Sequence, residues 1–414
     1  CAHVRTAGRE YNSSSASREG DRVEIRFGDS GVGLSLRVDI HDHYFIVEVI
    51  DVQGENIDSL TFINLTLRSD EVPGKGLAGC ALALNLQTNV PELPQANTKI
   101  RAICYPRFGM AGAKMALIGC PMTELRAVMQ EIVRAADDIP HSPIGGPWAL
   151  DADINKGSYL FNFADLSEET VDRWIEVARS LGITQIDFHG GRSFRFGDCK
   201  PNPETYPNGR ESLRKVVDRL HDAGISAGLH TYAFFIDKKC PWVTPVPDPR
   251  LAKDAQFTLA SALTADATQV PVVESTENMS TTTGFFVRNS VTLQIDDELI
   301  IYSGISKERP YAFTQCQRGA YGTSPSAHKA DSTVYHLKEC FGLFVPDGDS
   351  TLLAEVAAKT AQTFNECGFD MMYLDALDGE DILGGRENGW HYGSKFVFQL
   401  WSRLRRPALM EMST

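Results

Sequence analysis

The sequence predicts a multidomain protein in which an N-terminal β-sandwich precedes a (β/α)8-type barrel, and a small all-β insert interrupts that barrel. Three observations predict this mixed α/β plus all-β class. Apolar residues alternate with a period of two over residues 21–120, which is typical of short antiparallel strands. Strand and helix patterns alternate from residue 159, as in a parallel sheet. A Thr-, Ser- and Val-rich stretch with period-two strands of its own, residues 257–338, separates the third strand of that series from the fourth.

The size and charge of the chain limit what it can bind. Its 414 residues, 43% of them hydrophobic, suffice for two or three domains with buried cores. With 54 acidic and 40 basic residues the net charge is -14, so neither a nucleic acid nor an anionic membrane is an expected partner. No apolar run approaches the ~18 residues of a membrane span. A neutral carbohydrate partner fits this surface better.

Residues 1–20 are expected to form a flexible tether, because residues 9–22 are rich in Ser, Gly and charged side chains. The chain starts with Cys1 rather than Met. This start fits signal-peptide removal that leaves an N-terminal cysteine, as in a bacterial lipoprotein, and it fits an arbitrary starting point equally well. The first interpretation predicts a secreted or cell-surface protein.

The sequence contains nine cysteines, and an exported protein can form disulfides. Cys199 and Cys240 each follow a predicted strand of the parallel sheet and lie in loops, so they are the expected disulfide pair. Cys80, Cys120 and Cys367 have apolar neighbours and are expected to be buried thiols.

Residues 21–142 are expected to hold the β-sandwich, a helix and a linker. The strands are short and are separated by clusters of Asp, Gly, Ser and Asn. Apolar residues then repeat with helical spacing over residues 121–136. The Pro- and Gly-rich residues 140–147 indicate a linker to the next domain.

The first three barrel strands are expected within residues 143–256, at 159–163, 183–188 and 225–229. Each of the first two is followed by a helix with one apolar face. The third leads into the insert.

The fourth and fifth barrel strands are expected within residues 339–414. A helix at 352–367 leads to a strand at 370–374, and a further helix precedes a strand at 407–412. A barrel needs eight such units, so we expect about 100 further residues from a longer chain or from another polypeptide. The alternative is an open doubly wound sheet that ends here. A homo-oligomer is a further option.

The insert, residues 257–338, has the pattern of a small β module. A hairpin is expected at 291–302, an Arg-Gly-x-x-Gly-Thr turn at 318–323 and a closing strand at 332–337. An insert after a barrel strand rises from the face that carries the active site. Substrate gating, sugar binding, structural padding and contact with a neighbouring subunit all remain open as its role.

Polar side chains stand at the ends of all five predicted strands. In a parallel barrel these ends meet at one rim, where active sites are built. Trp242 and Trp390 lie in predicted loops at the same rim and could stack on sugar rings. The polar candidates for substrate binding or catalysis are Asp165, Asp187, His189, His230, Tyr232, Asp375, Asp378 and Glu411.

Asp375 is the centre of the predicted site. It stands where the buried strand 370–374 stops, before a turn rich in Asp and Gly. A retaining glycosidase uses an ionised carboxylate as nucleophile, and a short side chain on a fixed strand end suits that role. We therefore predict Asp375 as the nucleophile of a carbohydrate-active hydrolase that needs no cofactor. Asp378 is better suited to a turn or helix cap, and Glu411 to binding a sugar hydroxyl.

Two segments resemble the melibiase-type α-galactosidases and their clan. Residues 221–232, His-Asp-Ala-Gly-Ile-Ser-Ala-Gly-Leu-His-Thr-Tyr, are similar to the third-strand segment of these enzymes. Tyr373-Leu-Asp375-Ala-Leu-Asp378 stands where their fourth strand ends in the nucleophile, and Asp187 matches an acidic residue at the end of their second strand. The resemblance implies a retaining α-glycosidase on oligo- or polysaccharides. It also implies an acid/base Asp on a sixth strand, beyond the five predicted here.

Two other functions remain open. His189, His230, Asp187, Asp375 and Glu411 could gather around a divalent metal ion in a hydrolase, although they form no His-x-His or His-Glu-x-x-His motif. The other alternative is a non-catalytic extracellular protein that binds sugars or serves as a surface scaffold. The incomplete barrel and the β insert both favour this alternative.

Overall fold

The computed structural model describes residues 2–67, 76–92, 99–285 and 287–413. The chain divides into two compact units, Cys1–Ala152 and Asp153–Thr414. Cys1, the predicted lipoprotein cysteine, lies outside the described residues.

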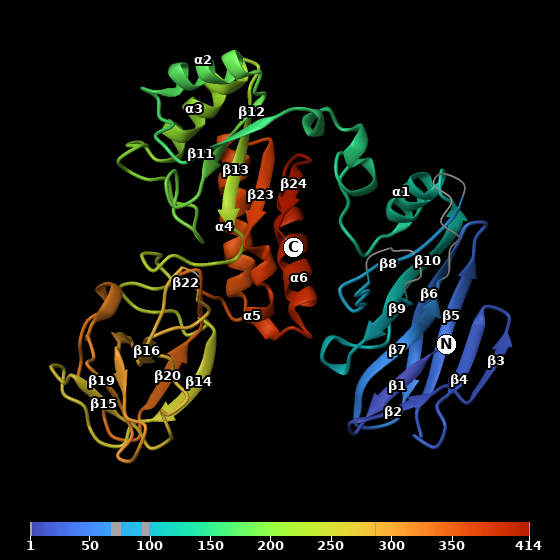
Figure 1. Ribbon diagram of the computed structural model, residues 1–414, viewed down its shortest axis with the longest axis horizontal. Helices are drawn as coiled ribbons and strands as arrows, with labels where there is room; N and C mark the ends of the chain where they lie inside the picture. The colour runs from blue at the N-terminus through green and yellow to red at the C-terminus, as the bar shows by residue number, and fades with distance from the viewer. Residues whose placement is uncertain (1, 68–75, 93–98, 286, 414) are drawn as a thin grey trace. The chain divides into compact units, whose positions relative to one another are not determined.

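The first unit contains two antiparallel sheets (Figure 1). One sheet has four strands, in the order β2 (Arg9–Asn12), β1 (His3–Thr6), β7 (Ile57–Thr66) and β9 (Lys99–Cys104). The other has six strands, in the order β3 (Ser15–Glu19), β4 (Arg22–Arg26), β5 (Gly33–Ile40), β6 (Tyr44–Gln53), β10 (Lys114–Pro121) and β8 (Leu77–Ala83).

Apolar residues from both sheets form one core. Val4 of β1 and Phe62 of β7 belong to the same buried cluster as Leu36 of β5. Successive side chains of a strand point to opposite faces, so the period-two pattern of the sequence places every second residue in this core. Helix α1 (Leu125–Ala135) buries Val128 in a second cluster, which includes residues of the six-stranded sheet.

The prediction of a flexible tether at residues 1–20 is wrong. These residues form β1, β2 and β3, and β1 pairs with both β2 and β7. Ala2 and Val4 are buried, which fixes β1 in the core. All five side chains of β3 are exposed, so its backbone pairing with β4 holds it in place. Its sequence therefore has no apolar alternation that could reveal the strand.

The second unit is built on a parallel sheet that contains the five predicted strands. In spatial order they are β11 (Tyr159–Asn162), β12 (Gln185–His189), β13 (Ser226–Tyr232), β23 (Met371–Asp375) and β24 (Leu409–Met412). The helices of this unit are α2 (Val171–Leu181), α3 (Arg210–Asp222), α4 (Leu352–Cys367), α5 (Asp381–Gly384) and α6 (Gly389–Trp401).

Helices pack on one face of this sheet (Figure 1). Phe188 of β12 lies on that face, with its ring 5.3 Å from Phe369, which in turn lies 6.5 Å from Phe364 of α4. The neighbouring side chains Asp187 and His189 point to the opposite face, because side chains alternate along a strand. The polar candidates of β12 therefore lie on the face that the helices leave free.

The sheet curves strongly around this polar face. Tyr159 Oη of β11 lies 3.2 Å from Glu411 Oε1 of β24, although these strands are the two edges of the sheet. The rings of Phe161 in β11 and Tyr373 in β23 are 5.5 Å apart. In a flat sheet three strand spacings would separate them by about 14 Å. A barrel wall curves in this way, but the sheet does not close within the described residues, so the (β/α)8 barrel stays a prediction.

A small all-β module lies between β13 and α4, as predicted. β14 pairs with β20, so this module begins at Lys253 and includes four residues that we assigned to the barrel segment 143–256. β16 and β17 form the predicted hairpin. The strands of the insert are β14 (Lys253–Thr258), β15 (Gln269–Pro271), β16 (Thr292–Ile295), β17 (Glu298–Ile301), β18 (Gly304–Ile305), β19 (Ala312–Thr314) and β20 (Thr333–Leu337), and β21 (Glu339–Cys340) and β22 (Leu343–Phe344) follow.

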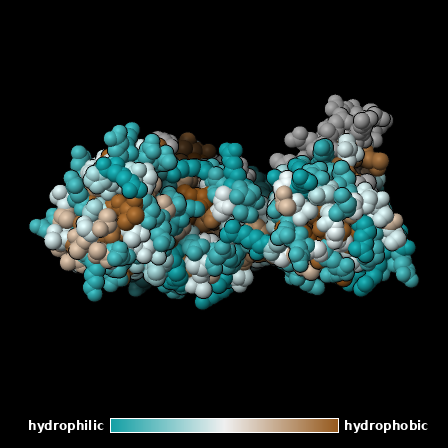
Figure 2. Space-filling view, turned by 90° about the horizontal axis from the view of Figure 1, so that it is seen from below, coloured by the Kyte–Doolittle hydropathy of each residue, from teal (hydrophilic) through white to brown (hydrophobic). Residues whose placement is uncertain are grey.

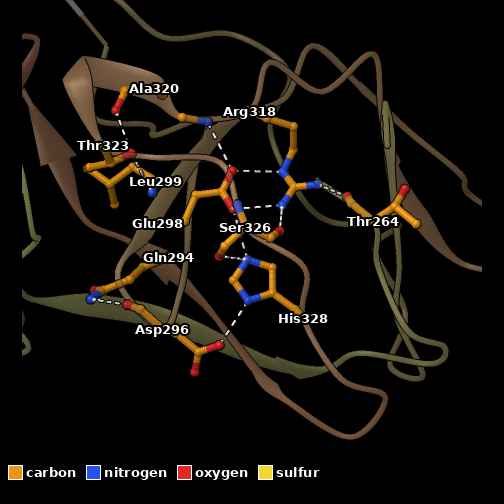
Figure 3. Close-up of polar contacts among 11 residues, drawn as sticks. Thr264, Gln294, Asp296, Glu298, Leu299, Arg318, Ala320, Thr323, Ser326 and His328 are labelled. Carbon is orange, nitrogen blue, oxygen red and sulfur yellow. Dashed lines mark hydrogen bonds and ion pairs between the residues drawn. The ribbon is translucent and has the colours of Figure 1, made fainter. Parts of the chain in front are cut away.

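The Arg-Gly-x-x-Gly-Thr turn of the insert surrounds a buried carboxylate (Figure 3). Glu298 accepts hydrogen bonds from Arg318 Nε at 2.8 Å and from Arg318 Nη2 at 2.6 Å. His328 Nε2 lies 2.8 Å from Glu298 Oε2, and the backbone N–H groups of Gly319 and Ser326 donate to the two carboxylate oxygens. Burial alone would raise the pKa of Glu298, but these hydrogen bonds outweigh burial and lower it. The motif thus marks a structural ion pair.

The predicted disulfide between Cys199 and Cys240 is absent, because both thiols are free. Cys199 Sγ faces the hydroxyl of Thr360 in α4 at 3.7 Å, whereas Cys240 Sγ donates to the carbonyl oxygen of Phe196 at 3.2 Å. The two sulfur atoms therefore have different neighbours. Burial raises the pKa of each thiol to about 12. The predicted buried thiols are confirmed at residues 80, 120 and 367.

Hydrophilic residues cover most of the surface seen in Figure 2, with apolar residues visible between them. This surface accords with the net charge of -14. Among the described residues, no helix has both the length and the apolar character needed to cross a bilayer.

Candidate functional site

The strand register brings four of the predicted site residues together. His189 at the end of β12 pairs with His230 in β13, and Tyr232 at the end of β13 pairs with Asp375 at the end of β23. His230 and Tyr232 are two residues apart, so they share one face of the sheet. The parallel strands thus carry two imidazoles, a phenol and a carboxylate to one rim, on the face that the helices do not cover.

The carboxylate of Asp375 holds a hydrogen-bond donor at each oxygen. His230 Nε2 lies 3.2 Å from Oδ2, and the backbone N–H of Ala376 donates to Oδ1 at 2.8 Å. The hydrogen bond from His230 is the main reason that the pKa of Asp375 lies below its usual value, although partial burial opposes it. The lowered pKa keeps Asp375 ionised at neutral pH. Its side chain is 31% exposed, so it is also open to solvent.

The backbone is strained directly after two of these strand ends. Ala376, next to Asp375, has φ of 60°, and Ala233, next to Tyr232, has φ of 28°. Residues with a Cβ rarely adopt such values, which cost on the order of 1–3 kcal/mol and gather at functional sites. The backbone directly after Asp375 therefore has a conformation that is unfavourable for these residues by themselves.

His189 and His230 lie edge to face, with ring centroids 4.5 Å apart. Burial and the neighbouring His230 lower the pKa of His189 to about 4, so His189 is neutral at pH 7. The Nδ1 atom of His230 is buried and has no hydrogen-bond partner.

Aromatic rings enclose the two histidines, and the sequence did not indicate this arrangement. Phe163 lies 4.3 Å from His189. Phe161 and Tyr373 lie 4.9 and 4.7 Å from His230. The signal was present as the alternation Tyr-Leu-Phe-Asn-Phe in the first strand, but the contacts depend on the curvature of the sheet.

Asp187 lies deeper than the rim position that we expected. It is fully buried, its Oδ1 accepts a hydrogen bond from Gln185 Nε2 at 2.8 Å, and its Oδ2 has no partner. Its register partner Gly228 lies four residues before Tyr232, the partner of Asp375, which is about 13 Å along the strand. Asp187 is therefore too deep to contact a substrate at the rim. Its offset from Asp375 along the strands also exceeds the roughly 5–9.5 Å between the two carboxyl groups of a glycosidase.

The environment of Asp187 favours a protonated carboxyl. Burial raises its pKa to about 7, and the nearby charge of Glu411 adds to this effect, although Gln185 opposes it. Gly228 makes room for the carboxyl group, because a Cβ at that position would lie 2.0 Å from Asp187 Oδ1. The glycine in the sequence element Ala-Gly-Leu-His is thus explained by the carboxyl group of Asp187 on the neighbouring strand.

We expect Asp187→Asn to remove the pH dependence of stability that this group causes. The folded protein holds the proton up to pH about 7, whereas the unfolded chain loses it near 3.8. The free energy of unfolding therefore falls by roughly 3 kcal/mol between about pH 5 and pH 8 in the wild type. The variant lacks this loss, so it should be the more stable protein at pH 8 but not at pH 5. Urea unfolding at both pH values measures the difference.

Asp218→Asn, at an exposed position of α3, is the matched control and should follow the wild type at both pH values. Parallel pH profiles for wild type and Asp187→Asn would show that Asp187 is ionised in the folded protein.

Asp165 is not gathered with the rim residues. It is mostly exposed, forms an ion pair with Arg192, and lines a polar groove of about 470 Å³ together with Asn202. The carbonyl oxygen of Asp165 accepts from the indole N–H of Trp174 at 2.7 Å. A part in binding substrate at the rim stays a prediction for this residue.

Glu411 was expected at the end of the fifth strand, and it is the last residue but one of β24, in register with Tyr373 and, through Tyr373, with His230. The strand continues to Met412, and Glu411 lines a hollow of about 550 Å³ together with Tyr159, Gln185 and Ser226, which start their strands. This hollow opens at the opposite end of the sheet from Asp375. The pKa of Tyr159 is raised to about 12, first by burial and second by the neighbouring Glu411.

The remaining candidates occupy turns or helices. Trp242 lies in the loop after β13, as predicted, where its carbonyl oxygen accepts from Asp248 N at 2.8 Å. Trp390 lies in the first turn of α6 rather than in a loop, and its indole donates to Glu387 O at 3.0 Å. Asp378 is exposed in a 3-10 turn and accepts from Ser413 Oγ at 3.3 Å. This placement agrees with the turn role that we favoured for Asp378.

Glu380 is a half-buried carboxyl that the sequence did not reveal as unusual. Burial and the neighbouring Asp381 raise its pKa to about 7. Its side chain lies against α6, where a Cβ at Gly393 would be 1.7 Å from Glu380 Oε2 and one at Gly389 would be 3.2 Å from its Cγ. Two glycines four residues apart on one helix face were the available signal. Because Glu380 faces α6, we assign it no part in the chemistry.

Within the described part of the chain, no group of three or more His, Cys, Asp or Glu side chains is arranged to hold a metal ion. His189 and His230 contact each other, but Asp187 is fully buried below the rim, and Glu411 contacts Tyr159. The geometry therefore gives no support to the metal-dependent alternative.

Comparisons with known proteins gave structural similarities only. No family model matches the chain, and no curated protein matches its sequence. Among solved structures, the α-galactosidase from Thermus thermophilus in complex with p-nitrophenyl α-D-galactopyranoside has 13% identity and a TM-score of 0.40. The match covers 99% of this chain and 70% of that enzyme.

Two further solved structures are of the same kind. The α-galactosidase from Lactobacillus brevis has 12% identity and a TM-score of 0.45, covering 99% of this chain, which spans 59% of that enzyme. The α-N-acetylgalactosaminidase from Bifidobacterium bifidum, in complex with GalNAc, has 11% identity and a TM-score of 0.41, covering 100% of this chain and 70% of its own. The solved structures to which this chain is similar are thus glycoside hydrolases.

Proposed function

We propose that this chain carries the nucleophile of a retaining α-glycosidase, and that Asp375 is that nucleophile. The observation that carries the proposal is the pairing of Asp375 with His230 at the rim of the parallel sheet, 3.2 Å between Oδ2 and Nε2. The sequence resemblance to melibiase-type α-galactosidases makes an α-galactoside or a closely related α-glycoside the expected substrate.

Three properties make Asp375 the best nucleophile among the described carboxylates on this face. Its lowered pKa keeps it ionised, its side chain is partly exposed, and two donors hold its orientation. Asp187 has the opposite properties, because it is fully buried and its pKa is raised to about 7. A nucleophile must be charged and accessible, so the two environments favour different roles.

The reaction that this site would support has two displacement steps. In the first, an oxygen of Asp375 attacks the anomeric carbon while the bond from that carbon to the glycosidic oxygen breaks. The leaving oxygen takes a proton from a general acid, which the family resemblance assigns to an Asp on a sixth strand. In the second step, a water gives its proton to that same group and attacks the anomeric carbon, which releases Asp375. Two inversions retain the configuration.

His230 has a positioning role in this proposal. Its Nε2–H holds the Asp375 carboxylate in one orientation and stabilises its negative charge before attack. When Asp375 becomes esterified to the sugar, this hydrogen bond also stabilises the carboxylate as the leaving group of the second step.

Covalent labelling tests the proposal. A fluorinated α-galactosyl fluoride, which forms the glycosyl-enzyme quickly and releases it slowly, should add one sugar to the protein. Peptide mass spectrometry should then locate the sugar on Asp375, and the Asp375→Asn variant should stay unlabelled. Turnover of α-galactosides without an adduct at Asp375 would contradict the assignment. Saturable sugar binding without labelling or turnover would support the non-catalytic alternative.

A further inference from the structure

An aromatic group from the insert adjoins the candidate site. Phe285 belongs to the insert, and its ring centroid lies 6.2 Å from that of Tyr232, the register partner of Asp375. Phe341, in the connection between β21 and β22, lies 6.0 Å from Tyr232 and 6.0 Å from Phe285. Three rings from separate parts of the chain therefore meet beside the proposed nucleophile.

This group rests on further aromatic rings, and one of its members is partly exposed. Tyr232 stacks on Phe196 with centroids 4.5 Å apart and planes at 20°. Phe341 packs on Phe235, a fully buried ring, at 5.3 Å. Phe285, in contrast, is 47% exposed. An exposed ring on a rigid aromatic base costs stability in water unless another molecule covers it.

Polar ties hold the insert against the rest of the second unit near these rings. Lys238, in the loop after β13, pairs with the buried Glu339 at 2.6 Å. Thr283, two residues before Phe285, donates to the same Glu339 oxygen at 2.9 Å. Burial alone would lower the pKa of Lys238, but the charge of Glu339 outweighs it and raises the pKa, so the lysine stays protonated. The chain two residues before Phe285 is thus tied to a buried ion pair.

We propose that Phe285, together with Tyr232 and Phe341, binds the second sugar ring of the substrate, and so makes the site selective for oligosaccharides. Tyr232 pairs with Asp375, so a sugar at Asp375 and a sugar on these rings would be neighbours in one chain. The apolar face of a pyranose ring stacks on an aromatic ring, while its hydroxyl groups stay in water. The insert would then contribute to substrate binding rather than serve as padding. This inference rests on the proposed glycosidase function.

Two kinds of substrate separate this role from the chemistry. α-D-Galactosyl fluoride has no second ring, so its hydrolysis reports only on the sugar at Asp375. Melibiose, raffinose and stachyose carry one, two and three further rings. We expect Phe285→Leu to lower kcat/KM for the three oligosaccharides by about tenfold, the typical effect of losing one aromatic anchor, and to leave galactosyl fluoride within about twofold.

Phe285→Tyr is the matched control, because it keeps the ring and should keep the wild-type preference for oligosaccharides. Leucine is apolar and of similar size, so the comparison isolates the ring face. Equal losses on fluoride and oligosaccharides, or no loss with either, would overturn the inference.

Binding to the Asp375→Asn variant, measured by calorimetry with raffinose, keeps the inference separate from the proposed reaction. Raffinose binding that weakens with Phe285→Leu, together with no hydrolysis of galactosyl fluoride by the wild type, would support the sugar subsite and contradict the glycosidase. Hydrolysis of galactosyl fluoride with no effect of Phe285→Leu on raffinose would contradict the subsite alone. The absence of both raffinose binding and galactosyl fluoride hydrolysis would contradict the sugar subsite and the glycosidase function together.

Discussion

Asp375→Asn should lower kcat for α-galactoside hydrolysis by at least about 10³-fold, which corresponds to roughly 4 kcal/mol of transition-state stabilisation. The amide has the same shape as the carboxylate, but it is a much weaker nucleophile and carries no charge. The side chain is 31% exposed and the amide oxygen can still accept from one of the two donors, so the cost to folding is small beside the loss in kcat. We therefore expect the loss in kcat rather than in folding.

The measurement is initial rate against substrate concentration for the wild type, Asp375→Asn and Asp218→Asn, with far-UV circular dichroism as a check on folding. Asp218 is exposed on α3 and pairs only loosely with Arg214 at 3.6 Å, so its variant should keep wild-type activity. An Asp375→Asn protein that retains more than about a tenth of kcat would exclude a nucleophilic role, because general electrostatic support alone is worth less.

His230 offers a second measurement of the same site. Without the hydrogen bond from His230, the pKa of Asp375 should rise toward its ordinary value. In His230→Phe, the acidic limb of the kcat/KM profile should therefore move to higher pH, because more of Asp375 is protonated at a given pH. An unchanged acidic limb would show that His230 does not contact Asp375 in solution.

Elements with a regular apolar pattern could be predicted closely from the sequence. Helix α4 has the bounds that its period predicts, residues 352–367. The inward residues expected in α3, Leu213, Val216, Val217 and Leu220, are all fully buried. In both helices one face packs against the rest of the second unit, so hydrophobic spacing and tertiary structure agree.

The contacts of the candidate site could be predicted only in part. The sequence identifies Asp375 as a strand end, but its neighbour His230 follows from the register between β13 and β23. Whether a polar residue lies at the rim or below it also depends on register, and Asp187 was misplaced for this reason. Sequence patterns show which face a residue is on, and they do not show its height along the sheet.

Predictions that relied on composition were the least accurate. The Ser-rich and charged start of the chain was taken for a tether, although its backbone pairs in β1, β2 and β3. Strand pairing depends on backbone groups that every residue has, so exposed edge strands leave little trace in side-chain composition. Cys199 and Cys240 were paired because both follow strands, but a disulfide depends on geometry that loop position does not fix.

The buried ion pair of the insert carries the second prediction of large effect. Arg318→Met should destabilise the insert by about 3–5 kcal/mol, because Glu298 would remain fully buried without its main counter-charge. Lys329→Met removes a positive charge from an exposed position of the same module and should change stability by less than about 0.5 kcal/mol. Hydrogen exchange followed by mass spectrometry of peptides from residues 253–337 measures the effect locally, since a chain of several modules need not unfold in one step.

A double variant separates charge pairing from packing in this network. Glu298→Met with Arg318→Met removes both charges and should be less destabilised than the sum of the two single variants by at least about 2 kcal/mol. His328 and the N–H groups of Gly319 and Ser326 would still lose their acceptor, so the double variant should not regain wild-type stability. The lowered pKa of Glu298 also implies that the wild-type insert loses stability as the pH falls below the ordinary value of 4.5. The double variant should lack this loss, and additive single effects would show that the arginine and the glutamate act independently.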